Sequence, residues 1–270
     1  MKNLVLGTAL GYGIYELKNF VLSFREHNKV DDVVLLVDLR ISEDTKTFLK
    51  KHNIQTQMFM SGNFIPTHIN NSRFVKYVDF ILDQENNYRN VFLCDTRDLI
   101  FQANPFENLP DSFLYFFSEE SKVKIKDEPY NSQWLKSLYG EEMFSTLEQF
   151  NIVCAGTTLG SMLNIKKYVL TIWRMLIEVG QKNPQLYRTN IDQGLHNFLA
   201  YKSGYEFDNF QIKETGDLVG TIGLTLTYSP ENITVDENDN ILIKNNIMPV
   251  IHQYDRSKTL SEMIDKKYEI

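Results

Sequence analysis

The sequence predicts an α/β fold with a mixed, mostly parallel central sheet flanked by helices and a small β-hairpin near the C-terminus. Over the first hundred residues, short apolar runs alternate with segments of helical period, as in repeated βα units. The chain has 270 residues and 43% hydrophobic content, enough to bury a full core. No repeat, low-complexity stretch or Pro/Gly-rich linker divides it, so we expect a single domain over residues 1–270.

Each expected element of the N-terminal part follows from its pattern. Ser42 and Ser72 precede apolar residues at helical spacing and are the expected N-caps of two helices. The fully apolar run Val91 to Cys94 reads as a buried strand. In chain order, the expected strands are 4–6, 33–37, 55–60 and 91–94, and the expected helices are 17–24, 42–49 and 72–82.

The remaining elements are shorter. A break near Gly140 is expected to divide one helical region, and the polar turn 237–240 is expected to close the hairpin. Residues 155–160, rich in glycine and threonine, read as a loop after a strand. The expected strands are 113–117, 152–154 and 221–227, followed by an apolar run before His252, and the expected helices are 131–150, 169–180, 192–201 and the polar C-terminus.

Composition excludes several classes of function. There are 35 acidic residues against 28 Lys and Arg, a net charge of −7, and no long basic run, so we expect no nucleic-acid partner. Cys94 and Cys154 form neither a CxxC pair nor a disulfide framework, which suits a reducing cytoplasm. No apolar run approaches the roughly 20 residues of a transmembrane helix, so any membrane contact is expected to be peripheral.

The acidic end of the strand 91–94 is the first candidate site. Asp95, Thr96, Arg97 and Asp98 follow it at the carboxyl edge of the predicted sheet, where ligands bind in open α/β folds. Two carboxylates on a tight turn can chelate Mg²⁺ or Mn²⁺ and leave coordination positions open for diphosphate oxygens. The alternative is that both aspartates cap a turn and pair with Arg97.

A glycine pattern near the N-terminus narrows the choice of nucleotide site. Residues 7–13 read GxxxGxG, which is neither the GxGxxG of a dinucleotide fold nor a Walker loop. A dehydrogenase or P-loop enzyme is therefore disfavoured. Thr8, Ala9 and Tyr12 remain candidates for a base or ribose pocket.

Two residues late in the chain have both a structural and a functional reading. His252 follows an apolar run and is a candidate third metal ligand, although a single histidine more often has a structural role. Asp192 stands before a helical stripe and is expected to be its N-cap. In a cleft, the same carboxylate would contact sugar hydroxyls.

Five segments in this order resemble the GT-A glycosyltransferases, in particular a group with chlorovirus-encoded, bacterial and plant members. The first contains the signature Asp-x-Arg-Asp followed by Phe-Gln and Asn-Pro-Phe. More distantly, the order of motifs is similar to that of the glycogenin-type family 8 transferases. The five segments are 92–106, 129–135, 154–160, 190–197 and 251–256.

The resemblance implies a metal site and a set of substrate contacts. The late histidine completes the metal site in the family, which implies Mn²⁺ or Mg²⁺ on Asp95 or Asp98 together with His252. The spacing Asp-x-x-Asp, in place of Asp-x-Asp, leaves open whether one or both aspartates bind the metal. The other implied contacts are Arg73, Thr96 and Arg97 near the nucleotide, Asp38 at the base or ribose, Gly156, Thr157, Asp192 and Gln193 around the donor sugar, and 129–134 with Glu119 and Glu120 facing the acceptor.

The resemblance also implies the reaction. We expect a metal-dependent glycosyltransferase that uses a nucleotide diphosphate sugar, with UDP-sugar favoured, and a glycan or other hydroxyl acceptor. Residues 1–106 would bind the nucleotide and 107–270 the sugar and acceptor. A retaining mechanism is favoured, with Asp192, Gln193 and Glu119 as catalytic candidates, in surface polysaccharide or glycoconjugate synthesis. The alternative functions are a sugar nucleotidyltransferase and a non-catalytic nucleotide-sugar or carbohydrate-binding protein. For Arg73, the alternative to a nucleotide contact is a solvated charge at a helix end.

Overall fold

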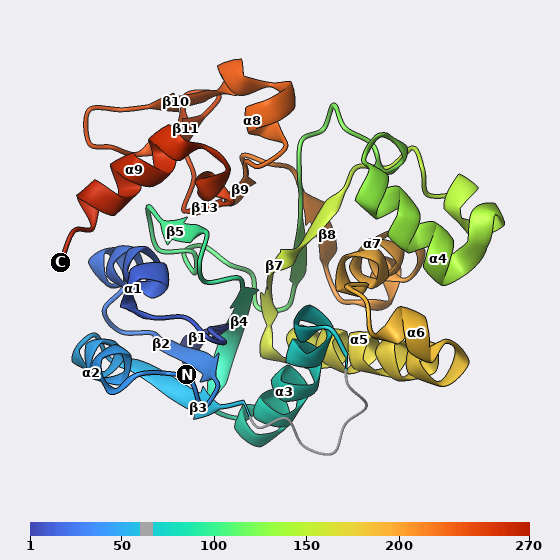
Figure 1. Cartoon of the computed structure of the whole chain (residues 1–270), viewed down its shortest axis with the longest axis horizontal. Coiled ribbons are helices and arrows are strands. Elements are labelled where there is room, and N and C mark those ends of the chain that lie inside the picture. Colours follow the sequence, from blue (N-terminus) through green and yellow to red (C-terminus); the bar gives the residue numbers. More distant parts are fainter. Residues whose placement is uncertain (60–66) are drawn as a thin grey trace.

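A computed structural model of the protein describes residues 1–59 and 67–270. Its centre is a seven-stranded sheet in the order β3-β2-β1-β4-β7-β6-β8 (Figure 1). β7 runs antiparallel to both of its neighbours, and the other pairs are parallel. The strands are β1 (Lys2–Thr8), β2 (Asp32–Val37), β3 (Ile54–Met58), β4 (Tyr88–Cys94), β6 (Leu114–Ser118), β7 (Val153–Ser161) and β8 (Phe210–Lys213).

Helices cover both faces of this sheet because its strands alternate apolar side chains between the two faces. In β1, Leu4 and Leu6 pack in the cluster that contains the buried faces of α3 and α5, whereas Val5 packs in the cluster with α1 and α2. Both sides of the sheet are therefore closed cores. The helices are α1 (Ile14–His27), α2 (Glu43–Lys51), α3 (Ile69–Gln84), α5 (Met162–Lys182), α6 (Pro184–Tyr187) and α7 (Asp192–Lys202).

A second, smaller sheet lies against the central one and joins distant parts of the chain. Its strands are β5 (Leu99–Phe101), β13 (Val250–His252) and β9 (Val219–Thr221), with β13 in the middle. The hairpin of β10 (Ile233–Val235) and β11 (Ile241–Ile243) lies beside it (Figure 1). The remaining elements are β12 (Asn246–Ile247), α8 (Thr225–Tyr228), α9 (Lys258–Lys267) and α4 (Pro129–Ser145), which is non-helical at Gly140.

The mixed α/β architecture and the C-terminal hairpin confirm the predicted fold class. Ser42 caps α2 as expected, but Ser72 lies inside α3, whose N-cap is His68. Residues 155–160 belong to β7. The strand expected over 221–227 is wrong beyond Thr221, the last residue of β9, because residues 225–227 belong to helix α8. The predicted strand 55–60 ends at Met58, and residue 60 lies outside the described residues. In the described part of the chain, no helix is both long and apolar enough to cross a membrane.

Gln102 ties the hairpin to β5, and its loss should weaken the fold. Its amide donates to the carbonyls of Ile241 and Met248 at 2.9 and 3.1 Å and accepts the N–H of Ile241 at 2.6 Å. At about 1 kcal/mol for each hydrogen bond, Gln102→Ala should lower the free energy of unfolding in urea by about 3 kcal/mol. Exposed Gln181 supplies the control Gln181→Ala. Equal stability of the two variants would contradict this role.

Candidate functional site

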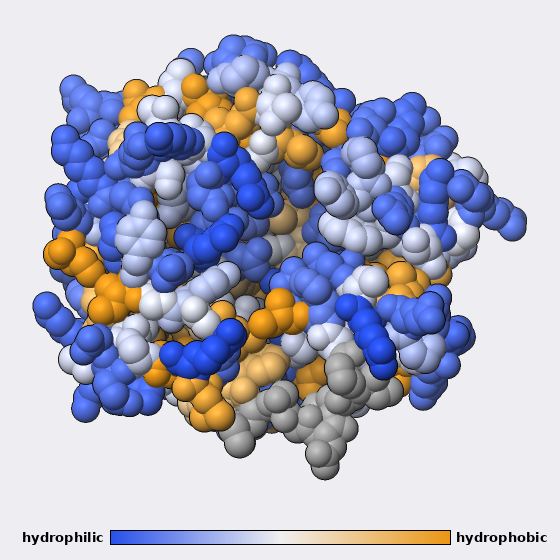
Figure 2. Space-filling model, viewed as in Figure 1, coloured by the Kyte–Doolittle hydropathy of each residue, from blue (hydrophilic) through white to orange (hydrophobic). Residues whose placement is uncertain are grey.

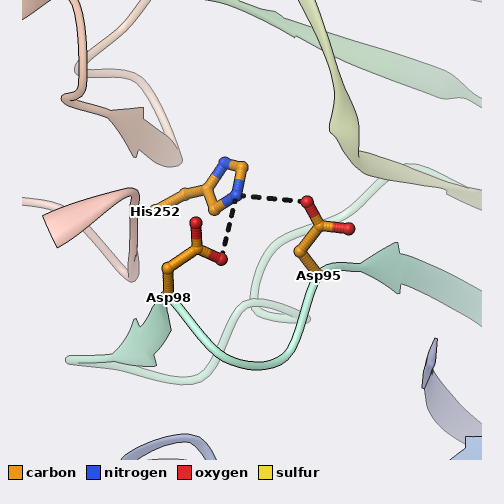
Figure 3. Close-up of side chains that lie close together, drawn as sticks. All are labelled: Asp95, Asp98 and His252. Atoms are coloured by element: carbon orange, nitrogen blue, oxygen red, sulfur yellow. Dashed lines mark ion pairs between the residues drawn. The ribbon is translucent and has the colours of Figure 1, made fainter. Parts of the chain in front are cut away.

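Two aspartates and a histidine meet where β4 leaves the sheet. Asp95 follows β4, Asp98 precedes β5, and the pairing of β13 with β5 sets His252 opposite Leu99. The Nε2 atom of His252 lies 3.6 Å from a carboxylate oxygen of each aspartate (Figure 3). One ligand atom from each of the three residues lies within 4.8 Å of the others. The structure therefore brings together all three predicted metal ligands.

The geometry around His252 fits a divalent cation. Its Nε2 atom is buried and has no hydrogen-bond partner within the described residues, and 3.6 Å to each carboxylate is too long for a hydrogen bond. Nδ1 faces the Cys154 sulfur at 3.7 Å. A cation with bonds of about 2.0–2.2 Å to oxygen and nitrogen suits the space between the three ligand atoms. Mn²⁺ and Mg²⁺ both accept such a donor set.

The alternative reading of the acidic turn does not hold for Arg97. Its guanidinium pairs with Asp255 at 3.0 Å, and no ion pair joins it to Asp95 or Asp98 among the described residues. One carboxylate oxygen of Asp95 and one of Asp98 therefore face His252. Thr96 fixes the turn instead, because its buried hydroxyl donates to the carbonyl of Thr8 at 2.7 Å.

Charge shifts the pKa values of the cluster. Desolvation would raise the pKa of Asp95, but Arg73 and His252 offset it and hold that pKa at about 2. Burial opposes a charged imidazolium, yet Cys154 and the carboxylates of Asp98 and Asp95 raise the pKa of His252 well above its ordinary value. A cation that binds there therefore displaces a proton from His252.

Arg73 joins this cluster to a second carboxylate. It is buried in α3, where its two terminal nitrogens each lie 2.6 Å from a carboxylate oxygen, one of Asp95 and one of Asp192. It also donates to the carbonyl of Ala155 at 3.1 Å. The interpretation of Arg73 as a solvated helix-end charge is therefore wrong. The N-cap of α7 is Ile191, so Asp192 is free to serve as the partner of Arg73.

A cavity of about 630 Å³ opens beside Arg73. In Figure 2 it is the hollow between the C-terminal segments and α4, lined by both polar and apolar side chains. Six of the singly predicted site residues line it, namely Arg73, Asp95, Glu119, Gly156, Asp192 and Gln193, as do Tyr130, Asn131 and Trp134 of the predicted acceptor segment 129–134. The other lining residues are Asn70, Glu128, Cys154, Ala155, Asn190, Gly223, Leu224, Thr227, Gln253 and Arg256.

Two predicted catalytic residues differ in how they are held. The amide of Gln193 accepts the N–H of Ala155 at 2.7 Å and donates to the carbonyl of Val153 at 2.8 Å, so it is fixed to β7. The Glu119 carboxyl receives no hydrogen bond from the described residues, and its burial raises its pKa to about 7. A carboxyl group with this pKa can take up or release a proton near neutral pH.

The remaining predicted contacts lie outside the cavity. Thr8 ends β1, and Ala9 and Tyr12 follow it, close to the acidic turn. Burial raises the pKa of the Tyr12 phenol, which Arg97 opposes and Asp95 and Asp98 reinforce. Asp38, at the end of β2, pairs with Arg40 at 2.5 Å. Thr157 is fully buried opposite Cys94, and its hydroxyl has no partner among the described residues.

Several lining residues had no role assigned from the sequence. Glu128 caps α4 by accepting the N–H of Asn131 at 2.7 Å. Arg256 enters the cavity from the segment after β13, and Gln253 beside it has the left-handed backbone angle φ 62°. Only the position of Arg256 in the sequence could have suggested that it lies near the site, because it follows the candidate metal ligand His252 by four residues.

Comparison with known proteins supports the fold. No protein-family model matches the sequence, and no curated protein matches it closely. A galactosyltransferase, LgtC, solved with donor and acceptor sugar analogues, matches with 15% identity over 98% of this chain and 95% of its own, at a TM-score of 0.59. The glycosyltransferase GlyE of Streptococcus pneumoniae matches with 16% identity over the whole chain and 61% of its own, at 0.57.

The chain has the GT-A fold. The match to LgtC covers nearly the full length of both chains, so it includes the central sheet and the small C-terminal sheets. At 15% and 16% identity the likeness establishes the fold. The GT-A frame places the cluster of Asp95, Asp98 and His252 at the carboxyl edge of the sheet, beside the cavity.

Gly156 should be essential for this cluster. A Cβ atom added there would lie 2.6 Å from an oxygen of Asp95 and 2.6 Å from a ring carbon of His252. Gly156→Ala should therefore displace both side chains and weaken Mn²⁺ binding at least tenfold in a calorimetric titration. The control is Gly180→Ala, whose added carbon meets Tyr187 at an ordinary 3.4 Å. Unchanged Mn²⁺ affinity in Gly156→Ala would show that the cluster is not the metal site.

Proposed function

We propose that the protein is a metal-dependent glycosyltransferase that moves a sugar from a nucleotide diphosphate sugar, with UDP-sugar favoured, to a hydroxyl of a glycan or glycoconjugate. The observation that carries the proposal is the buried Nε2 atom of His252. It has no hydrogen-bond partner among the described residues and faces Asp95 and Asp98 in a GT-A fold beside a polar cavity. We place this activity in the cytoplasm, in surface polysaccharide or glycoconjugate synthesis.

The metal site would consist of both aspartates and the histidine. Asp95 and Asp98 lie at equal distances from His252, so the geometry favours both as ligands of Mn²⁺ or Mg²⁺. A bound cation would supply positive charge to the diphosphate oxygens. Arg73 keeps Asp95 ionised, since its guanidinium favours the charged carboxylate.

The donor would lie across the metal site. We assign the base and ribose to Thr8, Ala9, Tyr12 and Asp38, because these residues lie at or just after the ends of β1 and β2 and do not line the cavity. The sugar would then enter the cavity. There it would contact Arg73, Gly156, Asp192 and Gln193. Thr96 and Arg97 would form the turn beneath the diphosphate. Thr157 is buried inside β7 and would help to pack that strand.

Transfer would proceed by attack of an acceptor hydroxyl on the anomeric carbon as the bond to the diphosphate breaks. Positive charge develops on the sugar in that transition state, and a fixed carboxylate nearby stabilises it. Asp192 suits this role because Arg73 orients its carboxylate at 2.6 Å. The acceptor proton would pass to the departing diphosphate in a retaining reaction.

Asp98 provides the direct test of metal-dependent binding. Asp98→Asn keeps the side-chain shape and removes the charge, so it should abolish metal-dependent binding of UDP or GDP in a calorimetric titration with Mn²⁺. Asp111, which lies on the surface and pairs with Arg89, gives the control Asp111→Asn. Nucleotide affinity that is the same in Asp98→Asn and in the control would overturn the proposed site.

The stereochemistry of transfer tests the role of Asp192. We expect the first-formed product to keep the anomeric configuration of the donor, as seen in the anomeric signals of a proton NMR spectrum. An inverted product would contradict this mechanism. It would assign the role of general base to a carboxyl group such as Glu119, whose pKa of about 7 suits proton transfer.

A further inference from the structure

Two aromatic side chains line the cavity from α4. Tyr130 and Trp134 are one helical turn apart, with ring centroids 6.0 Å apart and planes inclined at 34°. Tyr130 is 67% exposed, and neither side chain forms a hydrogen bond to another described residue. In Figure 1, α4 and β13 lie on opposite sides of β7 in the view. Tyr130 and Trp134 line the same cavity as Asp95 of the metal cluster.

The helix that carries the aromatic pair is fixed by its own cap and by its packing on α7. Glu128 caps α4, and Pro129 occupies its first turn. Gly194 of α7 lets the two helices approach closely, since a Cβ atom there would lie 3.0 Å from Cβ of Trp134 and 2.8 Å from a methyl carbon of Leu138. Because the backbone beneath both rings is fixed, only the side-chain rotations of Tyr130 and Trp134 lose conformational entropy when they bind a sugar ring.

The charges around the aromatic pair disfavour an anionic ligand. The cavity is lined by the carboxyl groups of Asp95, Glu119, Glu128 and Asp192 and by the guanidinium groups of Arg73 and Arg256. Asp95 and Asp192 are both paired with Arg73. One guanidinium thus faces two carboxylates, while Arg256, from the segment after β13, accompanies Glu128 and the Glu119 carboxyl, whose burial raises its pKa to about 7. Near the aromatic pair, Glu128, Asn131 and Glu119 offer oxygen atoms that accept hydrogen bonds from hydroxyl groups.

The resemblance already implies that residues 129–134 face the acceptor. Within that segment, we propose that Tyr130 and Trp134 bind a neutral pyranose ring of the acceptor by its apolar C–H face. The negative ring faces attract the polarised C–H groups of the sugar, while its hydroxyls reach Glu128 and Asn131. A nucleobase is a poorer fit, because no residue of β1 or β2 lines the cavity. The assignment of the sugar as acceptor rests on the proposed function, and the choice of a neutral pyranose deepens it.

Tryptophan fluorescence tests the contact directly. The chain has two tryptophans, and Trp173 lies on α5 against the core, so Trp173→Phe leaves Trp134 as the only tryptophan. We would titrate this variant with methyl glucoside, methyl galactoside and methyl mannoside in the presence of Mn²⁺ and UDP. At least one of the three should change the fluorescence emission of Trp134 and reach saturation. Sorbitol, an open-chain polyol, should not, and a methyl hexuronide should bind more weakly. An equal response to sorbitol, tighter binding of the hexuronide, or no response to any glycoside would overturn the proposal.

Substitution separates stacking from folding. By saturation-transfer NMR with the same glycosides, Trp134→Ala should weaken binding about tenfold, and Trp134→Phe should restore most of it. Tyr205→Ala, at a surface tyrosine that does not line the cavity, is the control and should bind like the wild type. Equal glycoside affinity of Trp134→Ala and the control would exclude the aromatic subsite. Failure of the proposed function can be told apart from failure of the aromatic subsite. In the former case, the wild-type protein would not bind UDP even with Mn²⁺ present.

Discussion

A buried guanidinium holds the site together. Arg73 is buried at the wall of the cavity, and a charge in such a place is tolerated only when oppositely charged partners and hydrogen bonds compensate it. Its partners come from three other elements: Asp95 after β4, Asp192 at the start of α7, and the carbonyl of Ala155 in β7. Because one planar group contacts all three, the metal cluster and the cavity share a fixed geometry. Removing either carboxylate would leave charge buried without its full compensation.

The second constraint is the pairing of β13 with β5. These strands are about 150 residues apart in sequence, yet their register sets His252 opposite Leu99, next to Asp98. A shift of one residue would turn His252 to the other face of the strand. Gln102 and the C-terminal hairpin hold this register, so the small sheet has a direct consequence for the proposed chemistry. His252 therefore lies at the carboxyl edge of the central sheet, although it belongs to β13 of the small sheet.

The sequence predicted the parts of the site that depend on local pattern. An apolar strand with an acidic exit located Asp95 and Asp98, and the order of motifs added His252. Arg73 was harder to interpret, because its burial depends on carboxylates from α7 and β4 that only the folded chain brings near it. Likewise, no periodicity distinguishes Gly156, which lines the cavity, from Thr157, which is buried within the core. The end of β9 at Thr221 was missed because β-branched residues continue beyond it.

The central claim is that Asp95, Asp98 and His252 together hold a divalent cation. A crystal soaked with Mn²⁺ and UDP, measured at the manganese absorption edge, tests it most directly. We expect an anomalous difference peak about 2.0–2.2 Å from an oxygen of each aspartate and from Nε2 of His252. A peak at another place in the protein, or a bound nucleotide without any peak at this cluster, would contradict the account.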